Sequence, residues 1–459
     1  VAPIDFSTAS ADSLSHATAL AKMYGLKEVV ALHIYFDEVA VRYDEHIEQV
    51  EWQEAKTFEN FLATVETLVV NVKTEVTKPE SISVTATESG LTVSARDKDD
   101  GGSYTAGNLT AQIVVGDSVI GTADTFANDG VDTGVLAVAQ QSTLKVAQIR
   151  VLDAAGNGAS FFGQVALGSS AGETLTGSDT IAGGRGGIDF LYGFDGNDTI
   201  NGKTGADYLY GGNNDDTFRF ASGSELNADV TVVGGSGNDT IEITAADTGI
   251  VDADFTDVNS VKTLSLTGAS PAVLGSEAVD AGIDTVDTGT GNTTITATVL
   301  TALTVASHVA DDSTLTLDVG AGDDVNFTVT GLQANLTVDN DHTGNVAVTL
   351  ASVADTTVAL GTNTTGTHSV NASALTNGQV LTLTGSDVAS VTLTDGDLSA
   401  SAYTGNLTVN ATSGTSPANS TNAITTGSGN DTITGGTGND TITGGAGADA
   451  IDAGAGDDF

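Results

Sequence analysis

The chain has no cysteine among its 459 residues, so it can form neither a disulfide framework nor a cysteine nucleophile. Basic residues are also scarce: 14 Lys and Arg stand against 60 Asp and Glu, a net charge of −46. A chain this acidic would repel phosphates, which excludes nucleic acid as a partner. Because so many carboxylates oppose compaction, we expect a bound cation to accompany folding.

Further absences narrow the classes of function. No apolar run is long enough for membrane insertion, and no signal peptide is visible at Val1. None of the six histidines stands in the H-E-x-x-H motif of zinc proteases. A G-x-S-x-G match occurs at Gly168–Gly172, but strand-like residues and glycine turns follow it where a lipase has a helix. The sequence therefore predicts a protein that is not an enzyme.

A nine-residue repeat, G-G-x-G-x-D-x-U-x with U a large apolar residue, is abundant instead. Four copies run from Gly184 to Arg219, and a second block runs from Thr426 to Phe459. Six residues suit a tight turn and three suit a short strand, with glycines allowing the positive φ angles that bring carbonyl oxygens together. The aspartate adds an anionic oxygen, and Ca²⁺ takes about six to eight oxygen ligands. The pattern predicts a calcium-bound parallel β-roll whose U residues point inward.

Two successive repeats should make one coil, so equivalent aspartates recur on neighbouring coils every second repeat. This register pairs Asp189 with Asp207, Asp198 with Asp216, Asp431 with Asp449, and Asp440 with Asp458. Isolated turns predict further ligands at Asp239 and Asp324. The glycines expected to shape the calcium turns are Gly193, Gly196, Gly202, Gly205, Gly435, Gly438, Gly444 and Gly447.

Some repeats depart from the pattern. Arg185, Phe194 and Lys203 replace the second glycine, and Asn214 replaces the glycine at position four, so we expect weaker binding at those turns. A degenerate copy at 289–295 has Thr293 in place of the aspartate, which predicts a coil without its ion.

Residues 1–66 differ from the rest of the chain. Asp12–Met23 and Gln49–Val65 read as amphipathic helices. The opening residues, including Pro3–Ser7 and Leu32–Tyr35, resemble the first β-α-β of a universal stress protein, in which Asp5 would contact ATP. That family's glycine-rich phosphate loop is missing downstream, so a small helical anchor or assembly domain is the competing interpretation.

The remaining segments show the alternation of apolar and polar residues that is typical of β-strands. Residues 67–167 predict a β-sandwich-like module, and Val151–Asn157 resembles the last strand of a bacterial Ig-like domain. The roll follows over 168–245, and short Thr/Val/Leu strands over 246–425 predict a β-solenoid, with a β-sandwich array as the alternative. The second calcium block, 426–459, reads as truncated. The predicted class is mainly β, with a small α-containing N-terminal segment.

The nonapeptides resemble those of the RTX (repeat-in-toxin) family of secreted Gram-negative proteins. This resemblance implies Ca²⁺ as the ligand, an extracellular location and secretion without a cleaved N-terminal signal. With its helix-containing start, Thr-rich solenoid and scattered calcium turns, the chain most resembles RTX-type S-layer proteins. That implies a structural cell-surface protein that assembles with itself and holds a surface polysaccharide through its N-terminal part. An RTX adhesin, or the non-catalytic part of a secreted RTX enzyme or toxin, are the alternatives.

Overall fold

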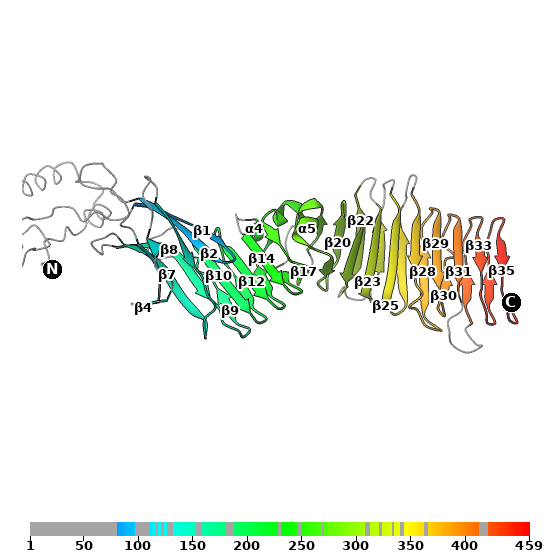
Figure 1. Ribbon diagram of the computed structural model, residues 1–459. Coiled ribbons are helices and arrows are strands. Elements are labelled where there is room, and N and C mark those ends of the chain that lie inside the picture. Colours follow the sequence, from blue (N-terminus) through cyan, green and yellow to red (C-terminus); the bar gives the residue numbers. More distant parts are fainter. Residues whose placement is uncertain are drawn as a thin grey trace, which may run out of the picture.

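The computed structural model describes residues 80–96, 110–115, 118–120, 124–125, 132–152, 158–179, 187–227, 231–245, 249–268, 270–307, 313–320, 324–332, 335–339, 344–361, 366–412 and 421–459. The predictions for residues 1–66, Asp5 among them, lie outside this part. The described residues form a rod in which an antiparallel β module is followed by a long parallel β-solenoid (Figure 1). The mainly β class with a parallel solenoid is confirmed, and the sandwich array is excluded for the body.

The antiparallel module has two sheets that share one apolar core. One sheet holds β1 (Glu80–Thr87), β2 (Gly90–Arg96) and β6 (Asp132–Ala137). The antiparallel strands of the other are β3 (Thr110–Val115), β4 (Ser118–Val119), β5 (Asp124–Thr125), β7 (Lys145–Leu152) and β8 (Gly158–Leu167). Alternation explains these strands, since β7 buries Ala147, Ile149 and Val151 and turns the residues between them outward.

Strand β8 corrects one expectation from the sequence. Val151–Asn157 resembled the last strand of the module, but β7 ends at Leu152 and β8 follows. β8 pairs antiparallel with β7 on one edge and parallel with β10 (Ile188–Asp195) on the other. One sheet therefore continues from the module into the solenoid.

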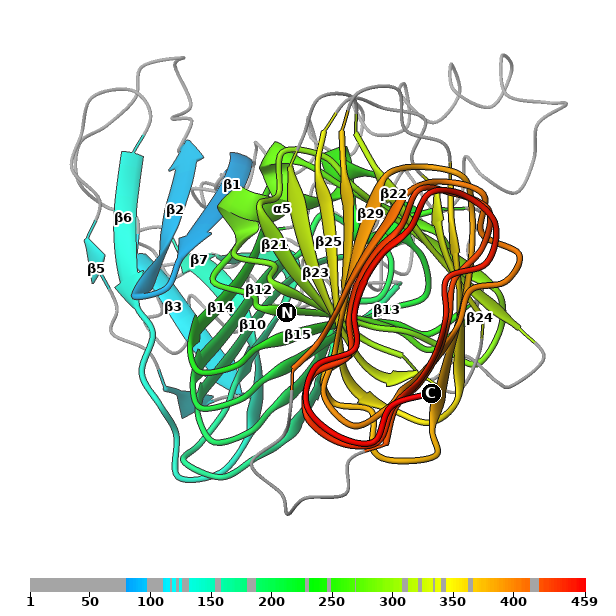
Figure 2. The same ribbon diagram turned by 90° about the vertical axis from the view of Figure 1, so that its right-hand side faces the viewer.

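Each coil of the solenoid places a strand on each of two faces, which Figure 2 shows along the rod. One face is a single 14-stranded parallel sheet. Its strands are β9 (Thr174–Thr176), β11 (Thr199–Asn201), β13 (Thr217–Phe220), β15 (Thr240–Ile243), β17 (Thr263–Leu266), β19 (Thr285–Asp287), β21 (Ala302–Ala306), β23 (Val325–Leu332), β25 (Val346–Val353), β27 (His368–Asn371), β29 (Ala389–Leu393), β31 (Leu407–Ala411), β33 (Thr432–Thr434) and β35 (Ala450–Asp452).

The other face is divided between two sheets. The first continues from β8 and β10 through β12 (Tyr208–Asn213), β14 (Thr231–Ser236) and β16 (Val258–Asn259). The second contains β18 (Ala272–Leu274), β20 (Thr293–Ala297), β22 (Thr314–Val319), β24 (Asn335–Asp339), β26 (Thr356–Leu360), β28 (Val380–Thr384), β30 (Asp397–Ser399), β32 (Ala423–Thr425) and β34 (Thr441–Thr443).

Short helices lie near the change between these two sheets (Figure 1). They are α4 (Gly223–Leu226), a 3₁₀ turn at Asp252–Phe255 and α5 (Ser276–Ala281). Among the residues that the structure describes, no helix has the length and apolarity needed to cross a membrane.

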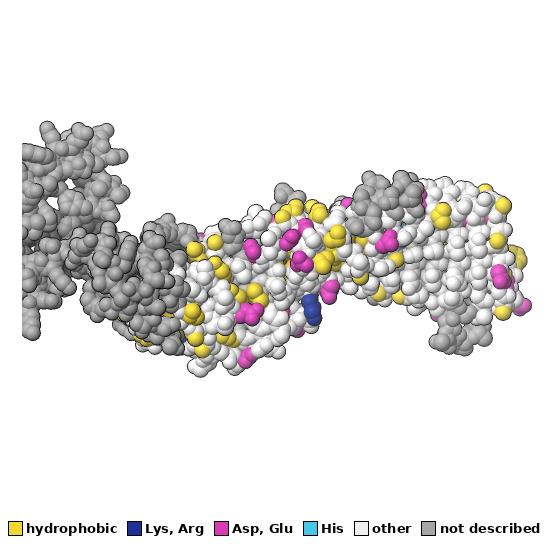
Figure 3. Space-filling view, turned by 45° about the horizontal axis from the view of Figure 1, so that its top comes forward, with side chains coloured by type: hydrophobic (Ala, Val, Ile, Leu, Met, Phe, Trp, Pro, Cys, Tyr) yellow, Lys and Arg dark blue, Asp and Glu magenta, His cyan; other side chains and the backbone are white. Residues whose placement is uncertain are grey.

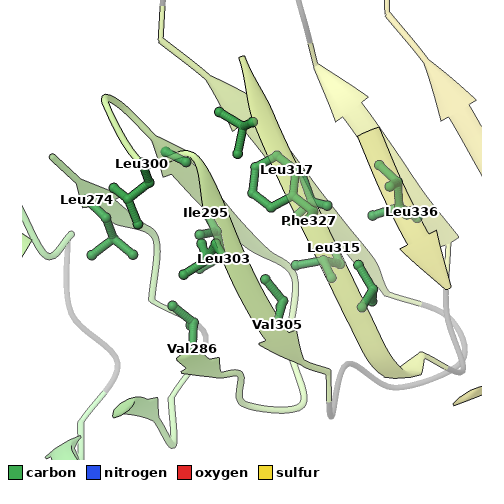
Figure 4. Packing of buried hydrophobic residues seen from close by; sticks show 14 of the residues in the cluster. Leu274, Val286, Ile295, Leu300, Leu303, Val305, Leu315, Leu317, Phe327 and Leu336 are labelled. Carbon is green, nitrogen blue, oxygen red and sulfur yellow. The ribbon is translucent and has the colours of Figure 1, made fainter. Parts of the chain in front are cut away.

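Strand length differs between the calcium blocks and much of the body. Hydrogen-bonded aspartates of neighbouring coils stand 18 residues apart in both calcium blocks. Many coils of the body are longer, for example 24 residues between the register partners Ala302 and Asn326. The short strand β11 buries Ile200 alone as an apolar residue, whereas the long strand β23 buries Val325, Phe327, Val329 and Leu332. Figure 4 shows such side chains of the body packed between the two faces.

Along the 14-stranded sheet, aligned positions on successive coils hold aspartates in some coils and apolar core residues in others. We call such a set of aligned positions a column. A row of aligned residues, mostly threonine, runs along its outer surface from Thr199 past Thr328 to Thr434. The residue before it is Asp198 in the first roll, Phe327 in the body and Ile433 in the last block. From β21 onward the body therefore fills with apolar side chains the positions that the first roll gives to buried carboxylates, whereas β17 and β19 are preceded there by the exposed residues Lys262 and Asp284.

Candidate metal centre: ladders of buried aspartates

Glycines make the room in which the aspartates sit. At position four of the repeats the backbone is left-handed, with φ of +107° at Gly196 and +138° at Gly438, which glycine adopts without strain. At position one a side chain would collide with the aspartate five residues on. A Cβ at Gly193 would clash with Asp198 Oδ2 and lie 2.5 Å from the carbonyl oxygen of Gly211. The sequence therefore leaves an empty space beside each carboxylate, faced by backbone carbonyls.

Hydrogen bonds join the aspartates of successive coils into a ladder. The backbone N–H of Asp198 donates to Asp216 Oδ1 at 2.8 Å, and the N–H of Asp216 donates to Asp239 Oδ1 at 2.9 Å. The Asp189–Asp207 pair has the same bond at 2.9 Å. In the last block the Asp431–Asp449 and Asp440–Asp458 bonds measure 3.0 and 3.1 Å. The structure thus brings together all four aspartate pairs expected from the repeat and adds Asp239 to the first ladder.

The second carboxylate oxygen of these residues, Oδ2, is the strongest evidence for a cation site. It is buried and has no hydrogen-bond partner in six ladder members: Asp198, Asp207, Asp216, Asp239, Asp431 and Asp440. A buried anionic oxygen without a partner is costly, and a cation in the adjacent space would compensate it. The residues present fit Ca²⁺, because carboxylate and carbonyl oxygens are the donors that it prefers.

The donor set also separates calcium from zinc. Within the described ranges there is no group of three or more His, Cys, Asp or Glu side chains close enough to hold a metal. Each site would combine the few carboxylates of neighbouring coils with backbone carbonyls such as that of Gly211. Zinc favours nitrogen and sulfur ligands, so this arrangement suits a hard cation.

Burial raises the pKa of the ladder carboxyls. It raises the pKa of Asp198 to about 6 and that of Asp207 and Asp216 to about 7, with neighbouring carboxylates adding to the effect. The pKa values of Asp189, Asp239 and Asp440 are raised by burial as well. In the absence of a cation, the ladder therefore holds protons near neutral pH.

These shifts predict opposite pH effects with and without calcium. The calcium-free folded roll binds protons more tightly than the unfolded chain, so its stability should rise as the pH falls through about 7 and about 6. In calcium the proton competes with the ion, so affinity and stability should fall over the same window. Thermal melts in EGTA and in calcium at several pH values would test this. Parallel pH trends in the two buffers would contradict it.

The other predicted site residues have different surroundings. Asp324 is exposed and stands apart from the ladders, where its Oδ1 accepts from the backbone N–H of Asn345 at 2.7 Å. Asp449 and Asp458 are half-buried in the last coils. Thr293, which replaces an aspartate, is buried, and its hydroxyl donates to the carbonyl of Ser270 at 2.6 Å. The polar group at this position therefore has a hydrogen-bond partner without an ion.

Three substituted turns keep the backbone shape of glycine. Phe194, Lys203 and Asn214 have φ of +75°, +70° and +80°. A left-handed conformation costs a residue such as Phe or Lys about 1–2 kcal/mol, so the turns at Phe194 and Lys203 are strained, whereas asparagine adopts this conformation more readily.

Two sets of contacts were not anticipated from the sequence. Residues at position five form a second ladder, in which Asn430 Oδ1 accepts from the N–H of Ala448 at 2.8 Å. The Gly-Asn-Asp triplets at positions four to six of several repeats could have indicated this second ladder. Aromatic residues at positions seven and nine stack on the outer face, with ring centroids 5.1 Å apart for Phe190–Tyr208 and 4.9 Å for Tyr192–Tyr210. Phe190, Tyr192 and Tyr210 belong to the module's core, so the module covers the first coils.

Comparison with known protein families identifies the repeats that form these coils. The RTX calcium-binding nonapeptide repeat matches in four copies, at residues 173–202, 192–224, 229–242 and 425–459. The chain carries RTX calcium-binding repeats. The RTX matches contain every ladder aspartate named above and leave the apolar body unmatched. No curated protein and no solved structure matches the chain.

The RTX match also includes the region just after the G-x-S-x-G motif. Gly168–Gly172 lies in the turn between β8 and β9, and both neighbours are strands. The hydroxyl and the N–H of Ser169 both donate to the carboxylate of Glu173. Glu173 in turn donates its N–H to Asp198 Oδ1 at 2.7 Å, so this turn is the first step of the RTX ladder.

Proposed function

We propose that this is a structural protein of the bacterial cell surface, in which calcium stiffens a β-solenoid that assembles with copies of itself into an S-layer-like lattice or filament. The observation that carries the proposal is the layout of the rod. Calcium ladders lie in its first and last coils, and an apolar solenoid body with no RTX match lies between them. We propose no catalytic role for it.

Charge gives calcium a second task in this proposal. Acidic side chains are scattered over the face in Figure 3, whereas basic ones are confined to one place. At a net charge of −46, copies repel one another until cations neutralise their carboxylates. Calcium would therefore both complete the fold of each rod and allow rods to meet. Attachment to a surface polysaccharide through residues 1–66 belongs to the same proposal.

Calcium should drive the purified protein from monomers into ordered sheets or filaments, and magnesium should do so poorly. Magnesium demands tighter octahedral geometry and gives up its waters reluctantly, whereas the ladder offers the irregular oxygen set that calcium accepts. Light scattering against each ion, followed by electron microscopy, tests this. A protein that stays monomeric at every calcium concentration would favour the RTX adhesin, or the non-catalytic part of a secreted RTX enzyme or toxin.

A further inference from the structure

A groove lies where the antiparallel module meets the first roll. Its volume is about 510 Å³, within the range of about 300–1,000 Å³ usual for ligand pockets. On one side is Glu88, in the turn between β1 and β2, and on the other are the outer surfaces of β10, β12 and β14. The hydroxyl of Tyr192 donates to the carbonyl of Thr87 at 3.0 Å and fixes this turn over the roll.

Phe194 is the aromatic ring that is partly accessible in the groove, and it lies on Tyr192 and Tyr210, which are buried in the core of the module. Tyr192 stacks on Tyr210 with an interplanar angle of 11°, and Phe194 lies against Tyr192 with a centroid distance of 6.1 Å. The residues aligned with Phe194 on the next two coils are Gly212 and Gly235. The groove wall beside the Phe194 ring is therefore backbone at Gly212 and Gly235.

Phe194 is itself a reason to look for a ligand here. It holds the strained left-handed conformation at repeat position two, where Gly212 serves the same turn two repeats later. Nothing in the aspartate ladder needs a side chain at this position. The ring packs in part against the module's core and in part lines the groove, so this turn places an aromatic side chain at the groove wall.

Polar side chains form a fixed row along the same groove. Gln140 Nε2 donates to Asp195 Oδ2 at 2.9 Å, and Asn213 Nδ2 donates to Asp195 Oδ1 at 2.7 Å. Ser236 Oγ donates to Asn213 Oδ1 at 2.8 Å. The bonds from Asn213 and Gln140 hold the pKa of Asp195 below its usual range, so this carboxylate is ionised. Asp195, Asn213 and Ser236 stand at one register position on successive coils.

This chemistry suits a sugar ring. The C–H face of a hexopyranose can pack on the Phe194 ring, and its hydroxyls can donate to Asp195 and both donate to and accept from Asn213. Because the groove residues include two carboxylates, Glu88 and Asp195, and no Lys, Arg or His, an acidic sugar would be repelled. A proline-rich peptide also fits aromatic grooves, but proline has no N–H to offer to a carboxylate.

The groove shares its backbone with the calcium ladder. Gly211 lines the groove, and a Cβ on Gly211 would clash with Asp216 Oδ2 and lie 2.6 Å from the carbonyl oxygen of Gly234. One surface of this turn therefore faces the ion and the other faces the groove. Without calcium the turn loses the contact that holds it, and the groove should lose its shape.

We propose that the groove between the β1–β2 turn and the first RTX coils binds a neutral glycan in a calcium-dependent manner. The residues that line the groove lie between Glu88 and Ser260 in the sequence, and the proposal requires no assembly, so it stands or falls independently of the proposed structural role.

Immobilised neutral tetrasaccharides of gluco, galacto, manno and rhamno configuration are the probes, with a uronic-acid tetrasaccharide and a proline-rich peptide beside them. We expect the protein in calcium to bind at least one neutral probe and to bind it at least tenfold more weakly in EGTA. The acidic sugar and the peptide should not bind. Failure of every neutral probe, or binding of the peptide alone, would overturn the proposal.

Two glycine substitutions locate the site. Phe194→Gly removes the ring and its packing on Tyr192 but relieves the backbone strain, so the roll should still fold and bind calcium while glycan binding weakens about tenfold. Lys203→Gly relieves the same strain at the same repeat position away from the groove, and glycan binding should not change. Calcium titrations verify that both variants keep the roll. Unchanged glycan binding in Phe194→Gly would refute the groove as the site.

Discussion

Chelation of calcium should open the two RTX blocks and leave the solenoid body between them folded. On the face of the 14-stranded sheet, strands of the blocks such as β11 and β33 bury a single apolar side chain each, and their coils bury carboxylates whose Oδ2 atoms have no partner. The body fills the corresponding column with residues such as Phe327 and buries several apolar side chains per strand. Its packing does not depend on an ion, because hydrophobic burial alone stabilises it.

Hydrogen exchange followed by mass spectrometry resolves the two parts. In EGTA, amides within 187–245 and 421–459 should exchange at rates near those of an unfolded chain, while those within 324–361 and 366–412 should stay protected. Leu317→Ala provides a control, because a large cavity in the body should cost about 2–5 kcal/mol with or without calcium. Uniform exchange along the rod in EGTA would show that the ladders also hold the body together.

Replacing Asp216 by asparagine should separate the two roles of a ladder carboxylate. The amide oxygen can still accept from the N–H of Asp198, so the calcium-free coil keeps its hydrogen bond. The lost charge and anionic oxygen should weaken calcium binding by roughly tenfold or more. Since burial raises the pKa of Asp216 to about 7, the neutral amide also removes a buried charge, and the roll in EGTA should be more stable than the wild type.

Asp216→Ala is the matched control. It removes the acceptor as well, and the buried N–H of Asp198 left without a partner should cost roughly 1–3 kcal/mol. Calorimetry gives the calcium affinities of the two variants, and thermal melts in EGTA give their stabilities. If the asparagine and alanine variants lost equal stability in EGTA, the Oδ1 hydrogen bond would not contribute to the ladder.

Most of the candidate metal site could be predicted from the nine-residue repeat. Period nine placed Leu191, Ile200, Leu209 and Phe218 inside, and the coil of two repeats put the aspartates 18 residues apart on neighbouring coils. These features are local, because each residue's role follows from its position within one repeat. The solenoid of the body was predictable for the same reason, from short alternating strands such as Thr314–Val319.

Features that depend on contacts distant in the sequence were not predictable. Tyr192 and Tyr210 occupy repeat positions that usually tolerate any residue, and only the module packed on them shows their use. The last block is offset by two residues against the first, so that Ile433 continues the column begun by Asp198. Nothing within either block encodes this offset, because it depends on the lengths of all the coils between them.

Strand β8 bears on the order in which the rod folds. A first parallel coil closes a loop before it has a neighbour to pair with, so starting a solenoid is slower than extending it. β8 forms with β7 through an antiparallel connection and requires no ion, and its free edge is the one that receives β10. The module is thus a template on which coils can be added one by one toward Phe459. The N–H groups of Gln164 and Gly168 face β10, so the N–H of Ala166 between them faces it too, and a proline at Ala166, which aligns with Leu191, would block that edge and delay every later coil.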